Sequence, residues 1–97
     1  MDKFSGTPGP WVADKTSRSV GPISRDDDQS YGMVIPVAWV EFDPEVEIQA
    51  SNQNIIAAAP DLLEALRNMV EAYQHEASID NPALLEARAA IAKALGK

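Results

Sequence analysis

The chain of 97 residues has no cysteine, one histidine and few aromatic side chains. Without cysteine it can form no disulfide bond, and it has no thiol nucleophile and no thiolate ligand for zinc or an iron–sulfur cluster. This composition is compatible with a reducing cytoplasm. The two Trp, two Tyr and two Phe residues are few enough to be used in the core and the sheet. The alternative is that one Trp anchors a partner protein.

Long hydrophobic runs and positive charge are also scarce. No apolar stretch approaches the roughly 20 residues that cross a bilayer, and residues 1–6 lack the apolar run of a secretory signal. Eight Lys and Arg against 15 Asp and Glu give a formal net charge of −7. Proteins that bind nucleic acid directly use clustered Lys and Arg on the phosphates. We therefore expect a soluble protein that binds neither a membrane nor nucleic acid.

The negative charge is concentrated in residues 26–47, which contain no Lys or Arg. This segment alone accounts for the whole net charge, and the rest of the chain is close to neutral. An acidic surface attracts basic partners. Its acids are the candidate partner-binding residues: Asp26, Asp27, Asp28, Glu41, Asp43, Glu45 and Glu47.

Two interpretations are open for the second group of acids, from Glu41 to Glu47. In an extended segment, alternate carboxylates project to one side, where they bind a divalent cation or imitate the phosphate spacing of nucleic acid. If a helix starts near Glu45, the row is interrupted, and the last acids interact favourably with the positive N-terminal end of the helix. The second interpretation is favoured. The first group, residues 26–28, lacks calcium-loop spacing and is expected to be a solvated turn.

The pattern predicts one α+β domain over residues 1–97. An irregular lead-in of residues 1–10 precedes a β-meander of about three antiparallel strands in residues 11–43 and a helical part in residues 45–96. The expected strands are residues 11–14, 18–24 and 31–42, the last being the strongest signal. Segregated strands and helices are typical of a small sheet with helices on one face.

The helical part is expected to contain two to three helices, of which the last two form an antiparallel hairpin. Pro60 is expected to interrupt the first helix, because proline removes a backbone donor and clashes with the preceding turn. Asn81 and Pro82 favour a start of the last helix. Gly96 favours its end.

Apolar residues at helical spacing define the candidate core or oligomer face of the helices. A small sheet and a helix pair bury little surface on their own, so we expect a homodimer. Whether one chain or two cover this face is left open by the sequence. The face comprises Ile55, Ile56, Leu62, Leu63, Leu66, Met69, Val70 and Tyr73.

No residue pattern points to catalysis. His75 is expected near a helix C-terminus, where a solvated, cationic imidazole is favoured. A general base needs a nucleophile and an orienting group beside it, and the chain has no G-x-S-x-G motif and no glycine-rich phosphate loop. We therefore expect no enzymatic activity, no metal and no cofactor.

The residues Gly9-Pro10-Trp11 and the run from Asn54 to Leu66 resemble a widespread set of small accessory proteins of bacteriophages and prophages. In those proteins an Asn-Ala-x-Leu-Ile-Ala-Ala-Ala-Pro-Asp-Leu-Leu-x-Ala-Leu type run is followed by another helix. Here Asn52-Gln53-Asn54 replaces the usual lead-in. The resemblance implies a phage or prophage setting, and thus the cytoplasm of the bacterial host.

In that setting, small acidic products are often non-enzymatic inhibitors of a host protein, including bacterial defence systems such as CRISPR complexes. The acidic segment is then the expected contact for a host protein with a basic surface. One alternative is a sponge that sequesters a host signalling nucleotide, for which Arg18, Arg25, Arg67 or Arg88 would face the phosphates. Another is a structural or assembly role in the phage.

Overall fold

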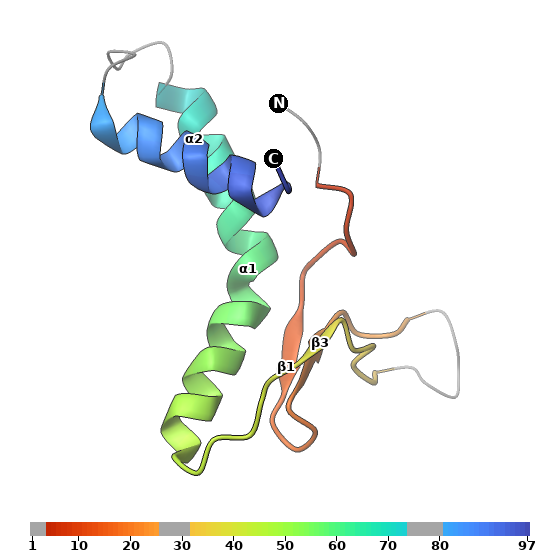
Figure 1. Ribbon diagram of the computed structural model, residues 1–97. Helices are drawn as coiled ribbons and strands as arrows, with labels where there is room; N and C mark the ends of the chain where they lie inside the picture. The colour runs from red at the N-terminus through yellow and green to blue at the C-terminus, as the bar shows by residue number, and fades with distance from the viewer. Residues whose placement is uncertain (1–3, 26–31, 74–80) are drawn as a thin grey trace. The chain divides into compact units, whose positions relative to one another are not determined.

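The structure is a computed structural model that describes residues 4–25, 32–73 and 81–97. A three-stranded antiparallel sheet comes first in the chain and the helices follow (Figure 1), so the expected α+β layout is confirmed. The elements are β1 (Val12–Asp14), β2 (Ser19–Gly21), β3 (Ala38–Trp39), α1 (Val46–Tyr73) and α2 (Pro82–Ala94).

The contacts divide the chain into two compact units. The first, called here the sheet unit, is Thr7–Pro60 and contains the three strands and the N-terminal part of α1. The second, called here the helical unit, is Asp61–Lys97 together with the N-terminal residues up to Gly6. It contains the C-terminal part of α1 and the whole of α2. The expectation of a single domain stays a prediction.

The sheet has the order β1-β2-β3, and the hairpin between β1 and β2 sets its register. Asp14 stands opposite Ser19 across this hairpin. The Asp14 carboxylate accepts the backbone N–H of Thr16 at 3.0 Å and the Thr16 hydroxyl at 2.7 Å. Arg18 has a φ of 59°, in the left-handed region that closes such loops. The turn is therefore stabilised by the hydrogen bonds of Thr16 to the Asp14 carboxylate.

The third strand is shorter than the sequence predicts. The expected strand of residues 31–42 is regular only at Ala38–Trp39. Pro36 has no N–H to donate, so the ladder is interrupted there. Backbone pairing nevertheless continues past it, because the Ile35 N–H donates to the Pro22 carbonyl at 2.8 Å. The segment thus follows β2 irregularly instead of as one long strand.

A glycine allows this irregular segment to approach β2 closely. A Cβ atom placed on Gly21 would overlap the backbone carbonyl of Ile35 and lie 3.0 Å from the Val37 nitrogen. Backbone atoms cannot move aside as a flexible side chain can, so only glycine fits at this position.

α1 contradicts the predicted break at Pro60. It is a single helix of 28 residues with Pro60 inside it. The residues on both sides are mainly Ala and Leu, the strongest helix formers, and they offset the loss of one hydrogen bond. Gly9 lies close to the proline ring, since a Cβ atom on Gly9 would be 2.7 Å from the Pro60 Cβ.

α2 begins and ends as its local signals predict. The Asn81 side chain accepts the N–H groups of Ala83 and Leu84 at 2.9 and 3.3 Å, and Pro82 occupies the first turn. Gly96 follows the last turn with a φ of 80°. These are the usual positions of a capping asparagine, an initial proline and a terminal glycine.

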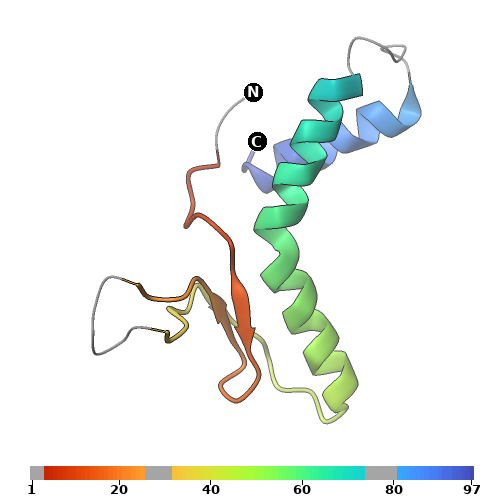
Figure 2. The ribbon, with the colours of Figure 1, turned by 180° about the vertical axis from the view of Figure 1, so that it is seen from behind.

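The core of the helical unit lies between the two helices. α2 packs across the C-terminal part of α1 (Figures 1 and 2). Val70, Leu84 and Ile91 are its buried hydrophobic residues, and they are joined by partly buried neighbours: Leu63, Leu66, Ala87 and Leu95. Over the part of the chain that the structure describes, neither helix combines the length and apolar character needed to cross a bilayer.

Candidate functional site

A buried glutamine holds the sheet to α1 within the sheet unit. Gln53 is 1% exposed, and its Nε2 donates to the backbone carbonyls of Asp14 at 2.8 Å and Ser19 at 3.0 Å. One side chain of α1 therefore satisfies acceptors on both β1 and β2. The Lys15 ammonium adds a second link by donating to the Asn54 side-chain oxygen. No local sequence pattern marks Gln53 as a buried residue.

The segment leading into β3 carries a row of exposed apolar side chains, called here the apolar strip. Val34 and Ala38 are half-buried and Val40 is buried, so exposure alternates along the segment except at Pro36, which is exposed. Period-two alternation is expected where one side of an extended segment faces a core and the other side faces solvent. The strip consists of Met33, Ile35, Val37 and Trp39.

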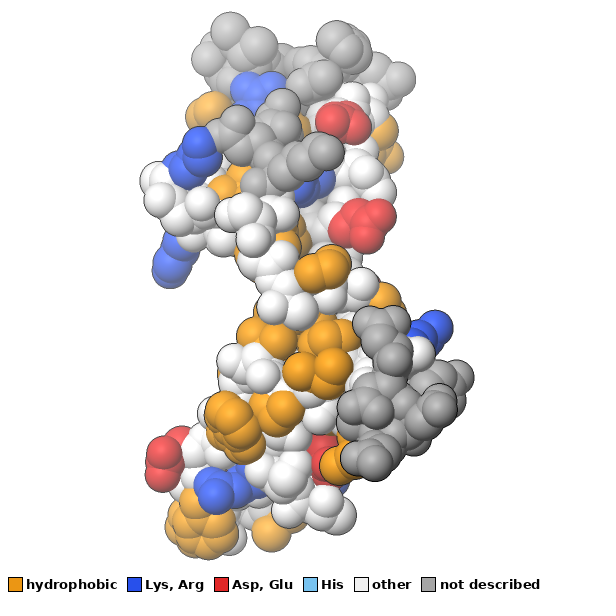
Figure 3. All heavy atoms as spheres, turned by 90° about the vertical axis from the view of Figure 1, so that its right-hand side faces the viewer, with side chains coloured by type: hydrophobic (Ala, Val, Ile, Leu, Met, Phe, Trp, Pro, Cys, Tyr) orange, Lys and Arg blue, Asp and Glu red, His pale blue; other side chains and the backbone are white. Residues whose placement is uncertain are grey.

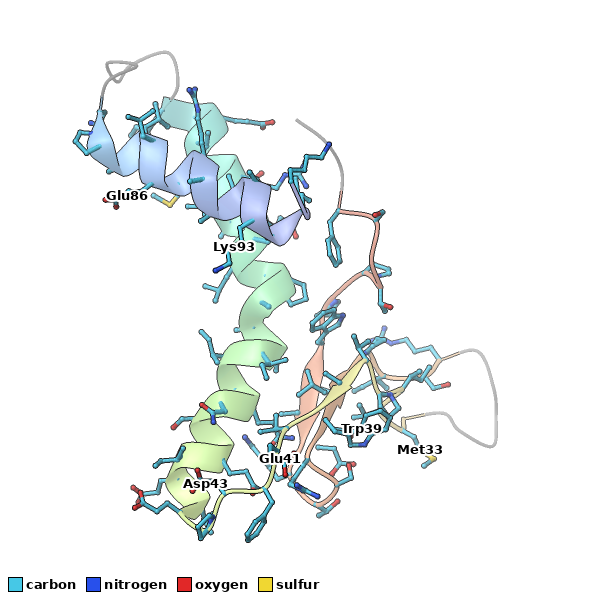
Figure 4. All side chains as sticks on the ribbon, in the orientation of Figure 1. Met33, Trp39, Glu41, Asp43, Glu86 and Lys93 are labelled. Carbon is cyan, nitrogen blue, oxygen red and sulfur yellow. The ribbon has the colours of Figure 1, made fainter. Side chains whose placement is uncertain are left out.

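Exposed hydrophobic side chains are numerous in the sheet unit. Figure 3 shows hydrophobic side chains gathered over the sheet unit. Figure 4 shows Met33 and Trp39 on the sheet segment, and Glu41 and Asp43 farther along the chain, towards the start of α1. Contiguous exposed apolar surface on a small protein is a common mark of a protein interface.

The aromatic residues were expected in the core and the sheet, and the structure places Trp39 in β3 but leaves several aromatic side chains exposed. Trp39 is 66% exposed, and Phe42 and Tyr73 are more than half exposed. Trp11 is partly buried, and its indole nitrogen is fully buried. Of the two tryptophans, Trp39 therefore has the surface position of a partner anchor.

The acids that follow the strip do not form one continuous row. Glu41 lies in the irregular segment after β3, whereas Glu47 lies in the first turn of α1. The backbone carbonyl of Glu45 accepts the N–H groups of Ile48 and Gln49 at 3.0 and 3.2 Å. The interpretation of residues 41–47 as one extended segment is therefore wrong for its last part. Because this part is helical, its acidic side chains do not project in one row.

Asp43 has a structural position at the start of α1. Its carboxylate accepts the Glu45 N–H at 2.8 Å, and its own N–H donates to the Gln49 side chain at 3.0 Å. Reciprocal bonds of this kind satisfy backbone groups ahead of a helix. Of the candidate acids before α1, Glu41 is thus the exposed residue nearest to Trp39 in the chain.

Several candidate residues lie outside the described residues: Asp26, Asp27, Asp28 and His75. Within residues 4–25, 32–73 and 81–97, no group of three or more His, Asp or Glu is arranged to hold a metal ion. Of the arginines considered for a nucleotide phosphate, Arg18 donates to the Val40 carbonyl at 3.2 Å. Arg18 and Arg25 belong to the sheet unit, whereas Arg67 and Arg88 belong to the helical unit.

The structure divides the predicted apolar face of α1 into two groups. Val70 is buried, and Leu63 and Leu66 pack against the core with α2, while Ile56 is half-buried in the sheet unit. The second group is exposed and consists of Ile55, Leu62, Met69 and Tyr73. Helical periodicity could not distinguish these groups, because both lie within one broad apolar arc.

The sequence of this small α+β protein matches a known family over its whole length. A family model described as Salmonella phage P22 protein Y8K6 matches residues 1–97. The chain belongs to this family and is a small phage protein. Neither the curated proteins nor the solved structures gave a match.

Proposed function

We propose that this phage protein acts without catalysis, by binding a bacterial host protein that has a basic surface. The observation that carries the proposal is the 66% exposure of Trp39 within the apolar strip, with Glu41 following two residues later. Apolar side chains supply the centre of the contact and carboxylates supply its edge.

A tryptophan in this position is suited to anchor a complex. Trp, Tyr and Arg are the residues that most often dominate binding energy, and they do so near the centre of an interface from which water is excluded. The strip is part of the sheet unit, where Gln53 ties β1 and β2 to α1 and β3 pairs with β2. A side chain presented by a held strand loses less conformational freedom on binding than one in a loose loop.

The net negative charge of the protein favours a partner with a positively charged surface. Charged groups at the edge of an interface steer the approach of an oppositely charged partner. Added salt screens this attraction and weakens it. A host protein that binds nucleic acid has the required basic surface. By occupying such a surface the protein would act as an inhibitor, as in the anti-defence role that the phage setting suggests.

The experiment is an affinity capture from a bacterial host lysate at low and at high salt, with bound proteins identified by mass spectrometry. The baits are the wild type, Trp39→Ala and the matched control Leu85→Ala. Leu85 is 50% exposed, and it lies in the helical unit, away from the proposed site in the chain. A basic protein should bind to the wild type and to the control, and should be lost with Trp39→Ala.

A further bait, Glu41→Gln, tests the charge separately. It should capture the same protein at low salt and lose it at a lower salt concentration than the wild type does. Equal capture by Trp39→Ala and the wild type would overturn the proposed site. Capture that is independent of salt and of Glu41 would overturn the proposed basic partner.

A further inference from the structure

β3 is an edge strand of the sheet. The sheet order is β1-β2-β3, so β2 covers one side of β3, and no strand of the described residues covers the other side. An edge strand presents backbone N–H and C=O groups that another chain can bind. This side of residues 33–39, which run between Met33 and Trp39 in Figure 4, is called here the open edge.

The hydrogen bonds to β2 show which peptide groups of Val34 point to the open edge. The Ser24 N–H donates to the Met33 carbonyl at 2.8 Å, on one side of Val34. On the other side, the Ile35 N–H donates to the Pro22 carbonyl at 2.8 Å. In an antiparallel ladder, a residue flanked by such bonds is in a non-hydrogen-bonded pair. Its own N–H and C=O therefore point away from β2.

Trp39 has the same backbone orientation. It pairs with Ser19, and the next N–H, that of Val40, donates to the Arg18 carbonyl at 2.8 Å. This is again the pattern of a non-hydrogen-bonded pair. Trp39 therefore presents its backbone N–H and C=O at the open edge, in addition to its exposed side chain.

The spacing of these two residues sets the length of a strand that pairs with both. In a regular strand, residues of the same orientation are an even number of positions apart, whereas Val34 and Trp39 are not. One residue between them is therefore extra, as in a β-bulge, and an opposing strand of about five residues spans both positions. Pro36 lies between them and has no N–H, which disfavours a longer, continuous pairing.

We propose that the host partner adds an extended segment to the open edge, with its main chain bonded to Val34 and Trp39. Outward N–H and C=O groups are complementary to the main chain of another extended segment, which is how peptides add to sheet edges. Glu41 is exposed two residues after Trp39, and residues 26–47 contain no Lys or Arg, so a segment with Lys or Arg fits the charge. The inference rests on the proposed function and adds the form in which the partner binds.

The first test uses the wild-type chain and three labelled peptides in fluorescence anisotropy titrations to about 1 mM at low salt. The probe is fluorescein-Lys-Val-Lys-Val-Lys-Val-Lys-amide, which is basic and favours an extended form. It should bind the wild type. The same peptide with N-methyl groups on its five central residues keeps the side chains but loses the N–H donors, and it should bind about tenfold or more weakly. A peptide with Glu in place of each Lys should also bind more weakly.

The second test places the peptide on the open edge. Val34→Pro and Val34→Ala both remove the valine side chain, but only the proline removes the N–H that points away from β2. Val34→Pro should raise the dissociation constant of the basic peptide about threefold or more above that of Val34→Ala. Trp39→Ala should raise it about tenfold. Urea denaturation of each variant shows whether the fold is kept.

Four results would overturn the inference. The wild type would fail to bind the basic peptide, or would bind the N-methylated peptide equally well. In folded variants, Val34→Pro would bind like Val34→Ala, which would place the peptide elsewhere. Sedimentation equilibrium would show copies of the wild type associating in a way that Val34→Pro abolishes and Val34→Ala keeps, which would give the open edge a different occupant.

The peptide titrations and the lysate capture separate this inference from the proposed function. Capture of a basic host protein that requires Trp39, without main-chain binding of the basic peptide, would keep the proposed function and overturn strand addition. Main-chain binding of the peptide that requires Val34 and Trp39, with lysate capture that does not require Trp39, would keep the open edge as a peptide site and overturn the proposed function.

Discussion

The two units differ in what holds them together. In the sheet unit, a fully buried polar side chain, Gln53, donates hydrogen bonds to two strands. In the helical unit, Val70, Leu84 and Ile91 form a small cluster with no polar member. Hydrogen bonds are directional and fix one arrangement, whereas apolar packing is tolerant of direction and depends on the area buried.

The two units also differ in their exposed apolar residues. In the sheet unit, Gln53 holds β1 and β2 to α1, and the apolar strip with Trp39 is exposed. In the helical unit, the large residues Met69 and Tyr73 are each more than half exposed. The proposed partner surface lies in the sheet unit.

The largest expected effect is in the sheet unit, from Gly21→Ala. Its new Cβ would overlap the Ile35 carbonyl, so β2 and the segment before β3 must separate. We expect a loss of about 4 kcal/mol or more in the free energy of unfolding, measured by urea denaturation. Gly96→Ala is the control in the helical unit: nothing lies within 4 Å of its Cβ, and its positive φ alone should cost about 1 kcal/mol. Equal effects would contradict the close approach at Gly21.

The next effect is in the helical unit, from Ile91→Ala. Removing this buried side chain leaves a cavity and should lower the free energy of unfolding by about 3 kcal/mol. Both tryptophans, Trp11 and Trp39, belong to the sheet unit. Their fluorescence should thus change less with Ile91→Ala than the helical circular dichroism signal does. A larger change in fluorescence would contradict the separation of the two cores.

Gln53→Leu should lower the free energy of unfolding somewhat less than Ile91→Ala does, and it should act mainly on the sheet unit. It leaves the carbonyls of Asp14 and Ser19 without their donor and should cost about 2 kcal/mol. The tryptophan fluorescence transition should shift more than the circular dichroism transition. Asn52→Leu, at an exposed position one residue earlier, should change stability by less than about 0.5 kcal/mol. If both variants behave alike, Gln53 is not the link between α1 and the sheet.

The smallest effect concerns the β1–β2 turn and depends on pH. Hydrogen bonds from the Thr16 hydroxyl and backbone N–H hold the pKa of Asp14 below its ordinary value of 3.8. The folded state therefore favours the carboxylate, and this contribution is present above pH 3.8 and is lost as the pH falls through the lowered pKa. Wild-type stability should decrease more than that of Asp14→Asn between pH 5 and about 2. Parallel curves would show that the turn bonds do not act on stability.

The sequence predicted features that depend on neighbouring residues. The start of α2 at Asn81 and Pro82 and its end at Gly96 follow from local backbone chemistry. The course of α1 through Pro60 was mispredicted, because the helix-forming residues around the proline outweigh its penalty.

The candidate site depended on long-range contacts and was less accessible to prediction. Gln53 is a buried polar residue because of strands more than 30 positions earlier in the chain, and no local pattern announces such a pairing. The exposure of Trp39 could not be predicted, since hydrophobicity alone does not say which face of a strand is covered. The acids from Glu41 to Glu47 were recognised as a group in the sequence. The start of α1 divides this group, because Glu41 precedes the helix and Glu47 lies in its first turn.

The most direct test of the account compares Trp39→Ala with Met69→Glu in the same host-protein capture experiment. Trp39 belongs to the proposed partner surface in the sheet unit, whereas Met69 is an exposed apolar residue of the helical unit. Trp39→Ala should therefore lose the captured protein, while Met69→Glu should keep it. Loss of capture with Met69→Glu and its retention with Trp39→Ala, in folded variants, would contradict the assignment.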